Sequence, residues 1–425
     1  MNVLNYWFRQ WTNPRRAPLR RSRDVSHWMK FAWAAECLEA RTLLSNVAVV
    51  VANGEVDLNG DSGDHTFAAS VVGSNLELAG SSGTTLTFNG TTSATVDIPL
   101  SQITPLKGLH FNMQGGNDTI TFDGTGLGTI AGNVVAFLGG GTNSFQLKNA
   151  TVAGDVDVFG GNNGNTVTLS SDTIQDATIL TGGGSDSLAL SSVTFQAAPL
   201  FPNISALSGL TVGGSLFVNA GGGDDTVALD SVTGATSLLG SWWNISGGLL
   251  GNDTTTLDSV TTHGPTFVTG GLGNETVSAT GSTFNGPTLV ASIAGQNQIN
   301  VKTSTFAGPA LLSTGIGDSP TISVEDSTFQ SSASFVEVGK NSQLDLESSG
   351  TSGAGSTFQG PVVAALPGPS ATVNIGSSSS SDKVAFNDFV IIVGGVPQAT
   401  VNIVTAATTI DNDKLFLLLA QRNNV

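Results

Sequence analysis

A short phrase returns at near-even distances along this chain and sets the scale of its folding unit. The phrase contains a Ser-Thr-Phe triplet and reads "GSTFNGP" at 281–287, "TSTFAGP" at 303–309, "DSTFQSS" at 326–332 and "GSTFQGP" at 355–361. Successive threonines of the phrase are 22, 23 and 29 residues apart. A period of this length is typical of a repeat protein in which each unit is one turn of a stacked array.

Weaker copies extend the period towards the N-terminus. They are marked by Thr151, Thr173, Thr194, Thr233 and Thr261, with steps of 22, 21, 39 and 28 residues. The longest step contains "APLFPNISALSGLTVGGS", which indicates an insertion into one unit. Insertions of this kind usually lie on one face of a repeat array.

The interior of a unit predicts strands. In "GGLGNETVSATGSTFNGPTLVASI", residues 270–293, short runs rich in Val, Thr, Phe and Ile alternate with Gly, Asn and Pro. Such a unit cannot bury an apolar face alone, but stacking on a neighbour at about 4.8 Å builds a continuous core. We therefore predict an all-β parallel β-helix (solenoid) with coils of about 22 residues. Phe284, Phe306, Phe329 and Phe358 would then form an inward-facing ladder.

An ordinary β-sandwich is the alternative, because it also places turn signals every 8 to 12 residues. A sandwich does not require the same residues to recur, so the solenoid is favoured. We expect a β-rich cap at 46–110, repeats at 111–375 and a closing β cap at 376–425, beginning near the Ser run "GSSSSSD". A bare solenoid end would expose core and strand edges, which is why caps are expected.

Charge separates the first 45 residues from the rest. That segment holds 8 of the 15 basic residues against three acids, whereas residues 46–425 hold 7 basic and 29 acidic side chains. The acidic body would repel nucleic acid and attract divalent cations or basic partners. With 39% hydrophobic residues the chain is too apolar for a disordered tract. Cys37 is the single cysteine, which excludes an internal disulfide and a thiolate metal cluster.

The basic segment has the composition of a targeting region. It contains four of the six tryptophans, and residues 24–44 favour a short helix. The apolar core of an ordinary secretory signal is missing, and no apolar run approaches the roughly 20 residues that would span a bilayer.

At "ECLEARTLLS", residues 36–45, the chain resembles the LEPR-XLL sorting segment of large extracellular proteins of planctomycetes and related bacteria. The matching residues are Leu38, Glu39, Arg41, Leu43, Leu44 and Ser45. Ala40 departs from the pattern, because it stands where the name-giving Pro would be. The resemblance implies export and residence at the cell surface or outside the cell, and it implies no chemistry. Gly-Asp-rich stretches such as "GGNDTITF" at 115–122 also resemble those proteins in composition.

Acidic turns before predicted strands are the candidate metal sites. "TGGGSDSLA", "AGGGDDTVA" and "GGLGNETVS" approach the calcium-binding nonapeptide G-G-x-G-x-D-x-U-x, although none is complete. Stacked coils would set Asp225 beside Asp253 and Asp230 beside Asp258. Facing carboxylates repel, and a cation, a proton or exposure to water relieves the conflict. The candidate calcium ligands are Asp186, Asp225, Asp253, Glu275, Asp230 and Asp258. Solvated turn residues without a metal are the competing interpretation.

The function expected from these features is a non-enzymatic, exported β-solenoid of the cell surface or extracellular matrix, with surface components, including polysaccharide, as partners. The alternative is a secreted carbohydrate-active enzyme, in which two carboxylates about 5 Å apart would act on a glycosidic bond. That alternative lacks clustered Arg or Lys in the acidic body. Trp242 and Trp243 would either fill a widened coil or form a small carbohydrate patch.

Overall fold

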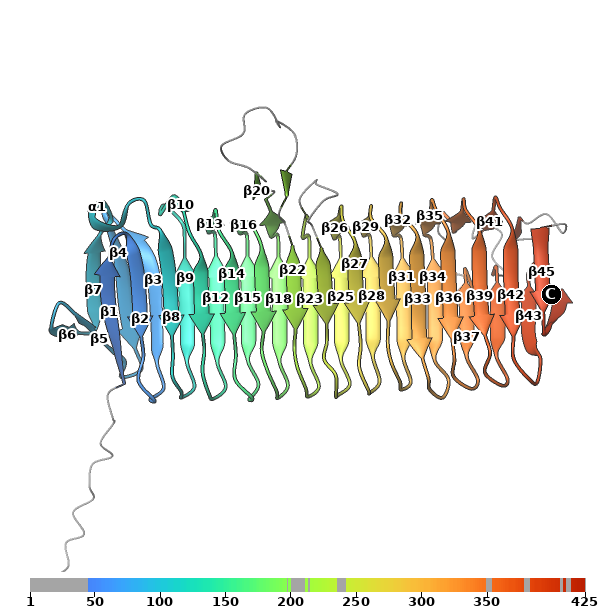
Figure 1. The fold of residues 1–425 in the computed structure, drawn as a ribbon, viewed down its shortest axis with the longest axis horizontal. Helices are drawn as coiled ribbons and strands as arrows, with labels where there is room; N and C mark the ends of the chain where they lie inside the picture. Colours follow the sequence, from blue (N-terminus) through green and yellow to red (C-terminus); the bar gives the residue numbers. More distant parts are fainter. Residues whose placement is uncertain are drawn as a thin grey trace, which may run out of the picture. The chain divides into compact units, whose positions relative to one another are not determined.

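The computed structural model is a stack of β-coils. It describes residues 45–424 except 197, 200–210, 213–214, 235–241, 349–353, 378–382, 406–407 and 410–413. The predicted helix at 24–44 and the sorting motif up to Leu44 lie outside the described residues. Parallel strands succeed one another along a single axis (Figure 1), so the predicted all-β parallel solenoid is confirmed.

Two long sheets form the broad sides of the stack. The sheet that we name sheet A has 17 strands: β1 (Asn46–Ala52), β2 (Glu55–Asn59), β5 (Thr85–Phe88), β6 (Thr91–Ser93), β8 (Gly108–Asn112), β11 (Val134–Phe137), β14 (Val156–Phe159), β17 (Ala177–Leu180), β22 (Leu216–Asn219), β24 (Trp243–Ser246), β27 (Thr266–Thr269), β30 (Thr288–Ala291), β33 (Ala310–Gly315), β36 (Ala333–Glu337), β39 (Val362–Leu366), β42 (Val390–Gly394) and β45 (Leu415–Leu418). Sheet B has 16 strands: β3 (Thr66–Val72), β4 (Asn75–Ser81), β7 (Thr95–Pro99), β9 (Thr119–Asp123), β12 (Ser144–Lys148), β15 (Thr166–Ser170), β18 (Ser187–Ser191), β23 (Thr226–Asp230), β25 (Thr254–Asp258), β28 (Thr276–Thr280), β31 (Gln298–Lys302), β34 (Thr321–Glu325), β37 (Gln343–Leu346), β40 (Thr372–Ile375), β43 (Ala399–Ile403) and β46 (Ala420–Asn424).

Short strands at one corner complete each coil. The corner strands are β10 (Thr129–Ile130), β13 (Thr151–Val152), β16 (Thr173–Ile174), β19 (Thr194–Phe195), β26 (Thr261–Thr262), β29 (Thr283–Phe284), β32 (Thr305–Phe306), β35 (Thr328–Phe329), β38 (Thr357–Phe358), β41 (Val384–Phe386) and β44 (Thr408–Thr409). Each recurring threonine of the sequence lies in this corner column, and Thr233 joins it through single bridges to Thr194 and Thr261. One coil therefore runs sheet B, corner, sheet A, and the observed repeat is one coil.

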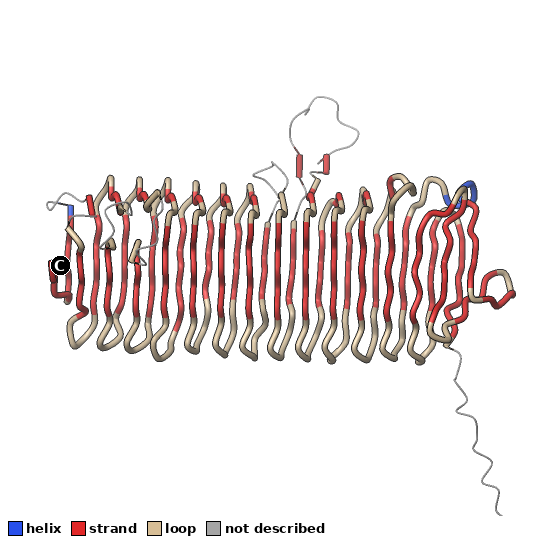
Figure 2. The backbone as a smooth tube through the Cα atoms, turned by 180° about the vertical axis from the view of Figure 1, so that it is seen from behind, coloured by secondary structure: helices blue, strands red, loops and turns tan. Residues whose placement is uncertain are grey.

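The strand register of sheet B is the same on both sides of the predicted insertion. Ser187 pairs with Thr226 across the 39-residue step, in the same column as the regular coils. The additional residues include a separate antiparallel pair, β20 (Ala198–Pro199) with β21 (Thr211–Val212). This pair leaves the stack between the corner strand β19 and the sheet A strand β22, and it projects from one side in both backbone views (Figures 1 and 2).

Residues 46–110 mix antiparallel and parallel pairing. Strand β1 pairs antiparallel with β2, and β3, β4 and β7 form an antiparallel meander. Strands β2 and β3 then pair in parallel with β8 and β9, and this pairing begins the parallel stack. A four-residue helix, α1 (Leu100–Ile103), lies between β7 and β8. At the other end, β42 pairs with β45 and β43 with β46, both in parallel. The boundaries proposed at 45, 110 and 375 remain predictions.

The core is the space enclosed by the coils. Side chains alternate inward and outward along the strands, and most of the inward ones are apolar. Phe284, Phe306, Phe329 and Phe358 are buried at the corner, with neighbouring ring centroids 4.8, 4.6 and 4.9 Å apart and nearly parallel planes. Phe386 continues the column at 5.0 Å. The predicted aromatic ladder is therefore confirmed.

Candidate functional site

Four of the six predicted metal ligands lie in one buried column. Asp186, Asp225, Asp253 and Glu275 each directly precede a strand of sheet B, and each is 2–3% exposed. We name the whole column of residues at this position the inner ladder. Its polar members are His65, Asp118, Asn143, Asn165, Asp186, Asp225, Asp253, Glu275, Asn297 and Ser342.

Inner-ladder side chains accept hydrogen bonds from the backbone of the preceding coil. The N–H of Asp186 donates to Asp225 Oδ1 at 2.7 Å, and the N–H of Asp225 donates to Asp253 Oδ1 at 3.0 Å. Asn297 serves Glu275 in the same way, at 2.9 Å. Because both Asn and Asp occupy this position and accept the same kind of hydrogen bond, the position requires an acceptor oxygen rather than a negative charge.

Glycines make room for the longer ladder side chains. A Cβ added to Gly247 would lie 2.6 Å from Asp253 Cβ, and one added to Gly270 would lie 2.5 Å from Glu275 Cγ. Both glycines directly follow a sheet A strand, across the turn from the ladder residue. The side chains of Asp253 and Glu275 occupy the space beside these glycines inside the turn, so their carboxylates are shielded from solvent.

Burial changes the acidity of this column. It raises the pKa of Asp225 to about 7, against the lowering effect of the Asp186 N–H and with support from neighbouring acids. Burial likewise raises the pKa of Glu275 to about 7, aided by the charge of Asp253. The Oδ2 atoms of Asp186, Asp225 and Asp253 are buried without a hydrogen-bond partner. A proton on Asp225 or Glu275 near neutral pH reduces the expected repulsion.

The other predicted pair, Asp230 and Asp258, is in register but differently placed. The two residues are partners at the ends of β23 and β25 and both are exposed. Each carboxylate accepts a hydrogen bond from the hydroxyl of the following serine, at 2.9 Å from Ser231 and 3.2 Å from Ser259. Within the described ranges, no group of three or more His, Cys, Asp or Glu side chains converges in a geometry that could hold a metal ion.

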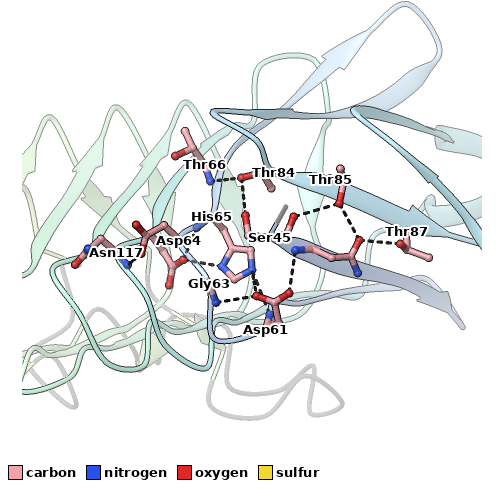
Figure 3. Close-up of polar contacts among 12 residues, drawn as sticks. Ser45, Asp61, Gly63, Asp64, His65, Thr66, Thr84, Thr85, Thr87 and Asn117 are labelled. Carbon is pink, nitrogen blue, oxygen red and sulfur yellow. Dashed lines mark hydrogen bonds and ion pairs between the residues drawn. The ribbon is translucent and has the colours of Figure 1, made fainter. Parts of the chain in front are cut away.

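A histidine network closes the inner ladder at its N-terminal end (Figure 3). His65 is fully buried, its Nδ1 lies 2.7 Å from Asp118 Oδ1, and its Nε2 accepts the Asp61 N–H at 3.2 Å. Burial opposes protonation of the ring most strongly, but Asp118 and Asp61 together raise the pKa of His65. Ser45, the last residue of the predicted sorting motif, is also buried, and its Oγ lies 3.3 Å from Thr84 Oγ1. Both ring nitrogens serve structural bonds, so this His–Asp pair fits a cap rather than a catalytic base.

The outward face of sheet A is the second candidate site, and the sequence pattern did not indicate it. From β11 onwards the outward side chains are mostly apolar, and several are large and exposed: Phe137 (49%), Phe217 (40%), Leu311 (37%), Phe416 (54%) and Leu418 (60%). Phe137 stacks on Phe159 at 4.9 Å along the stack. The opposite face, on sheet B, carries mostly Thr, Ser, Asn and Gln at the equivalent positions, with Asp258 and Lys302 at strand ends.

Shallow hollows lie on this apolar face. One is lined by Phe267, Leu289 and Leu311 with Pro287 and Pro309. Another begins at the turn after sheet A, between Leu249, Ala291 and Ile293. It connects the face to an exposed apolar ridge of turn residues, namely Leu249, Leu250, Leu272, Ile293, Ile316 and Val338.

The two adjacent tryptophans lie in different environments. Trp243 is buried and packs edge-on against Phe195 at 5.4 Å, so it fills the coil. Trp242 is 59% exposed, and its ring centroid lies 6.0 Å from that of Phe267, at the margin of the sheet A face.

Comparisons with known proteins add no relative. No protein-family model, curated protein or solved structure matches the chain. Among the described residues, no helix has the length and apolar character needed to cross a membrane.

Proposed function

We propose that this chain is an exported protein of the cell surface or extracellular matrix, in which the solenoid is a structural and adhesive element without catalysis. The observation that carries the proposal is the placement of the acids. Asp225 and Asp253 are buried as ladder acceptors, and Asp230 and Asp258 are paired with their own serines. The repetition therefore serves stacking, which is what a spacer requires.

The enzyme alternative needs two accessible carboxylates that flank a substrate. The buried pair cannot meet a glycosidic bond, and the hollows on sheet A include neither Asp225, Asp253 nor Trp242. Exported location is supported by the resemblance of residues 36–45 to the LEPR-XLL segment. The proposed partners are surface or matrix components, including polysaccharide.

Incubation of the full chain with a panel of neutral and uronate polysaccharides separates the two functions. The proposal predicts retention of the protein by insoluble polysaccharide without release of reducing or unsaturated ends. Release of such ends that is lost in Asp225→Asn, while Asp230→Asn keeps it, would establish the enzyme instead.

Calcium belongs to the same proposal as a stabilising ion of the acidic turns. At neutral pH the acid column is partly ionised, and a divalent cation would relieve repulsion there as a proton does. Thermal unfolding at about pH 7.5 in millimolar calcium and then in excess chelator tests this, because an ion that binds the folded state raises the midpoint. An unchanged midpoint would remove calcium from the proposal and leave protons as the neutralising species.

A further inference from the structure

The two broad faces of the solenoid differ in a way that stacking alone does not require. In the neighbouring coils around β30 and β33, sheet A presents Leu289 and Leu311 outward, in register with each other. On sheet B, the neighbouring strands β31 and β34 present Asn300 and Ser323 outward, also in register. Both faces satisfy their backbone ladders equally, so the apolar side chains on sheet A are an addition that a partner would explain.

Charge is depleted on the same face. Among the described outward positions of the strands from β11 to β45, Asp157 is the one charged side chain. The whole chain has a net charge of −17, so two copies repel over most of their surface. Sheet A is the face on which two copies can approach with little repulsion.

The face is also large enough and suitably shaped. Its strands lie side by side in a long, even row (Figures 1 and 2). A row about 55 Å long and about 13 Å wide offers roughly 700 Å² a side, so two such faces bury about 1,400 Å² in contact. Stable specific interfaces bury about 1,200–2,000 Å² in total, and sheets pack face to face at about 10 Å through such interdigitating side chains.

We propose that the outward face of sheet A binds a second copy of this chain, sheet A against sheet A. Leu289, Leu311, Phe267 and Phe217 form the centre of the contact, and the exposed ridge from Leu249 to Val338 forms one margin. The inference goes beyond the proposed function and does not depend on where the protein resides.

Sedimentation velocity of the full chain tests the proposal, from about 1 to 100 µM and at about 0.5 M salt. The wild type is expected to form a dimer that salt strengthens, since screening removes the repulsion between acidic copies. The double variant Leu289→Lys, Leu311→Lys is expected to dimerise at least tenfold more weakly. Asn300→Lys, Ser323→Lys adds the same charge to the opposite face and is the matched control, expected to dimerise as the wild type does.

Circular dichroism checks that each variant keeps the fold, and Phe217→Ser, at a side chain already 40% exposed, is a milder second probe. A wild type that stays monomeric to about 100 µM overturns the proposal. So does a dimer that survives both sheet A changes, because the contact would then lie elsewhere, for example on the basic N-terminal segment. A monomeric wild type retained by polysaccharide through the same leucines would assign the face to that partner and overturn self-association.

Discussion

The residue directly before each Ser-Thr-Phe triplet shows how one backbone conformation restricts the repeat sequence. Directly before the Ser of the triplet, the backbone turns into the left-handed region, with φ of 58° at Gly281, 52° at Thr303, 51° at Asp326 and 78° at Gly355. Gly and Asp tolerate this region, whereas a β-branched residue is strained there. Thr303 is the strained member of this set.

Replacing Thr303 by Asn should therefore stabilise the protein by about 1 kcal/mol, because Asn adopts the left-handed region at lower cost. Thr303 is exposed, so little else changes. The midpoint of urea unfolding measures the effect. Thr280→Asn, at an exposed strand end in the preceding coil, is the control and should be neutral or slightly destabilising. A lower midpoint for Thr303→Asn would contradict the strain argument.

At the scale of the element, the Ser-Thr-Phe corner has three separate roles. The serines Ser282, Ser304, Ser327 and Ser356 are buried, and each accepts the backbone N–H of the residue one coil earlier, at 3.0–3.2 Å. The threonines begin the short strands, and the phenylalanines stack inward. The triplet thus places one acceptor, one strand residue and one core ring at every turn.

Removing the hydroxyl of one of these four corner serines should lower the free energy of unfolding. In Ser304→Ala, the N–H of Ser282 loses its acceptor, and the carbonyls of Ala279 and Lys302 lose a donor. A buried donor left without a partner costs about 1–3 kcal/mol. Urea unfolding should show that loss for Ser304→Ala, whereas Thr305→Ala, at the part-exposed neighbour, should cost clearly less. Equal losses in the two variants would argue against this role of the serines.

Parts of this element could be predicted from sequence, and parts could not. The even spacing of the Phe residues was enough for the aromatic column, because a stacked repeat superposes like residues. The repeated triplet also predicts that Ser and Thr beside the rings bond along the turns. It does not predict that each Ser accepts a backbone N–H from the preceding coil, since Ser also suits exposed turns. Asp224 and Asp225 are adjacent, and only the fold decides which one points inward. The apolar face of sheet A was missed because its strands of four to six residues are too short for an alternation to stand out. The second and fourth residues of "VVAF" and "TLVA" and the second residue of "ALLS" carry part of the signal.

For the whole molecule, buried acids make stability depend on pH. Burial raises the pKa of Asp172, Asp225, Glu275 and Glu347 to about 7 and that of Glu337 to about 9. The folded state therefore binds protons more tightly than the unfolded state does. The stabilisation is complete below the unfolded pKa values near 4 and is lost as pH rises through 7 to 9. The raised pKa of His65 acts in the same direction, above its unfolded value of 6.5.

The unfolding midpoint should accordingly be higher at about pH 5.5 than at about pH 8.5 in calcium-free buffer. Asp225→Asn keeps an acceptor for the Asp186 N–H and removes the charge, so its stability relative to the wild type should be about 1–2 kcal/mol higher at pH 8.5 than at pH 5.5. Thermal unfolding followed by circular dichroism at both pH values measures this, with the exposed Asp230→Asn as control. A wild-type midpoint that rises towards pH 8.5 would show that the buried acids are ionised and compensated.

The central functional claim is that this solenoid works outside the cell, and immunogold labelling of the producing cells tests it most directly. An antibody raised against residues 46–425 would be applied to thin sections, with a strain lacking the protein as control. The account predicts gold at the outer surface or in the surrounding matrix, and loss of that pattern when residues 1–45 are removed. Label confined to the cell interior in the intact protein would contradict it.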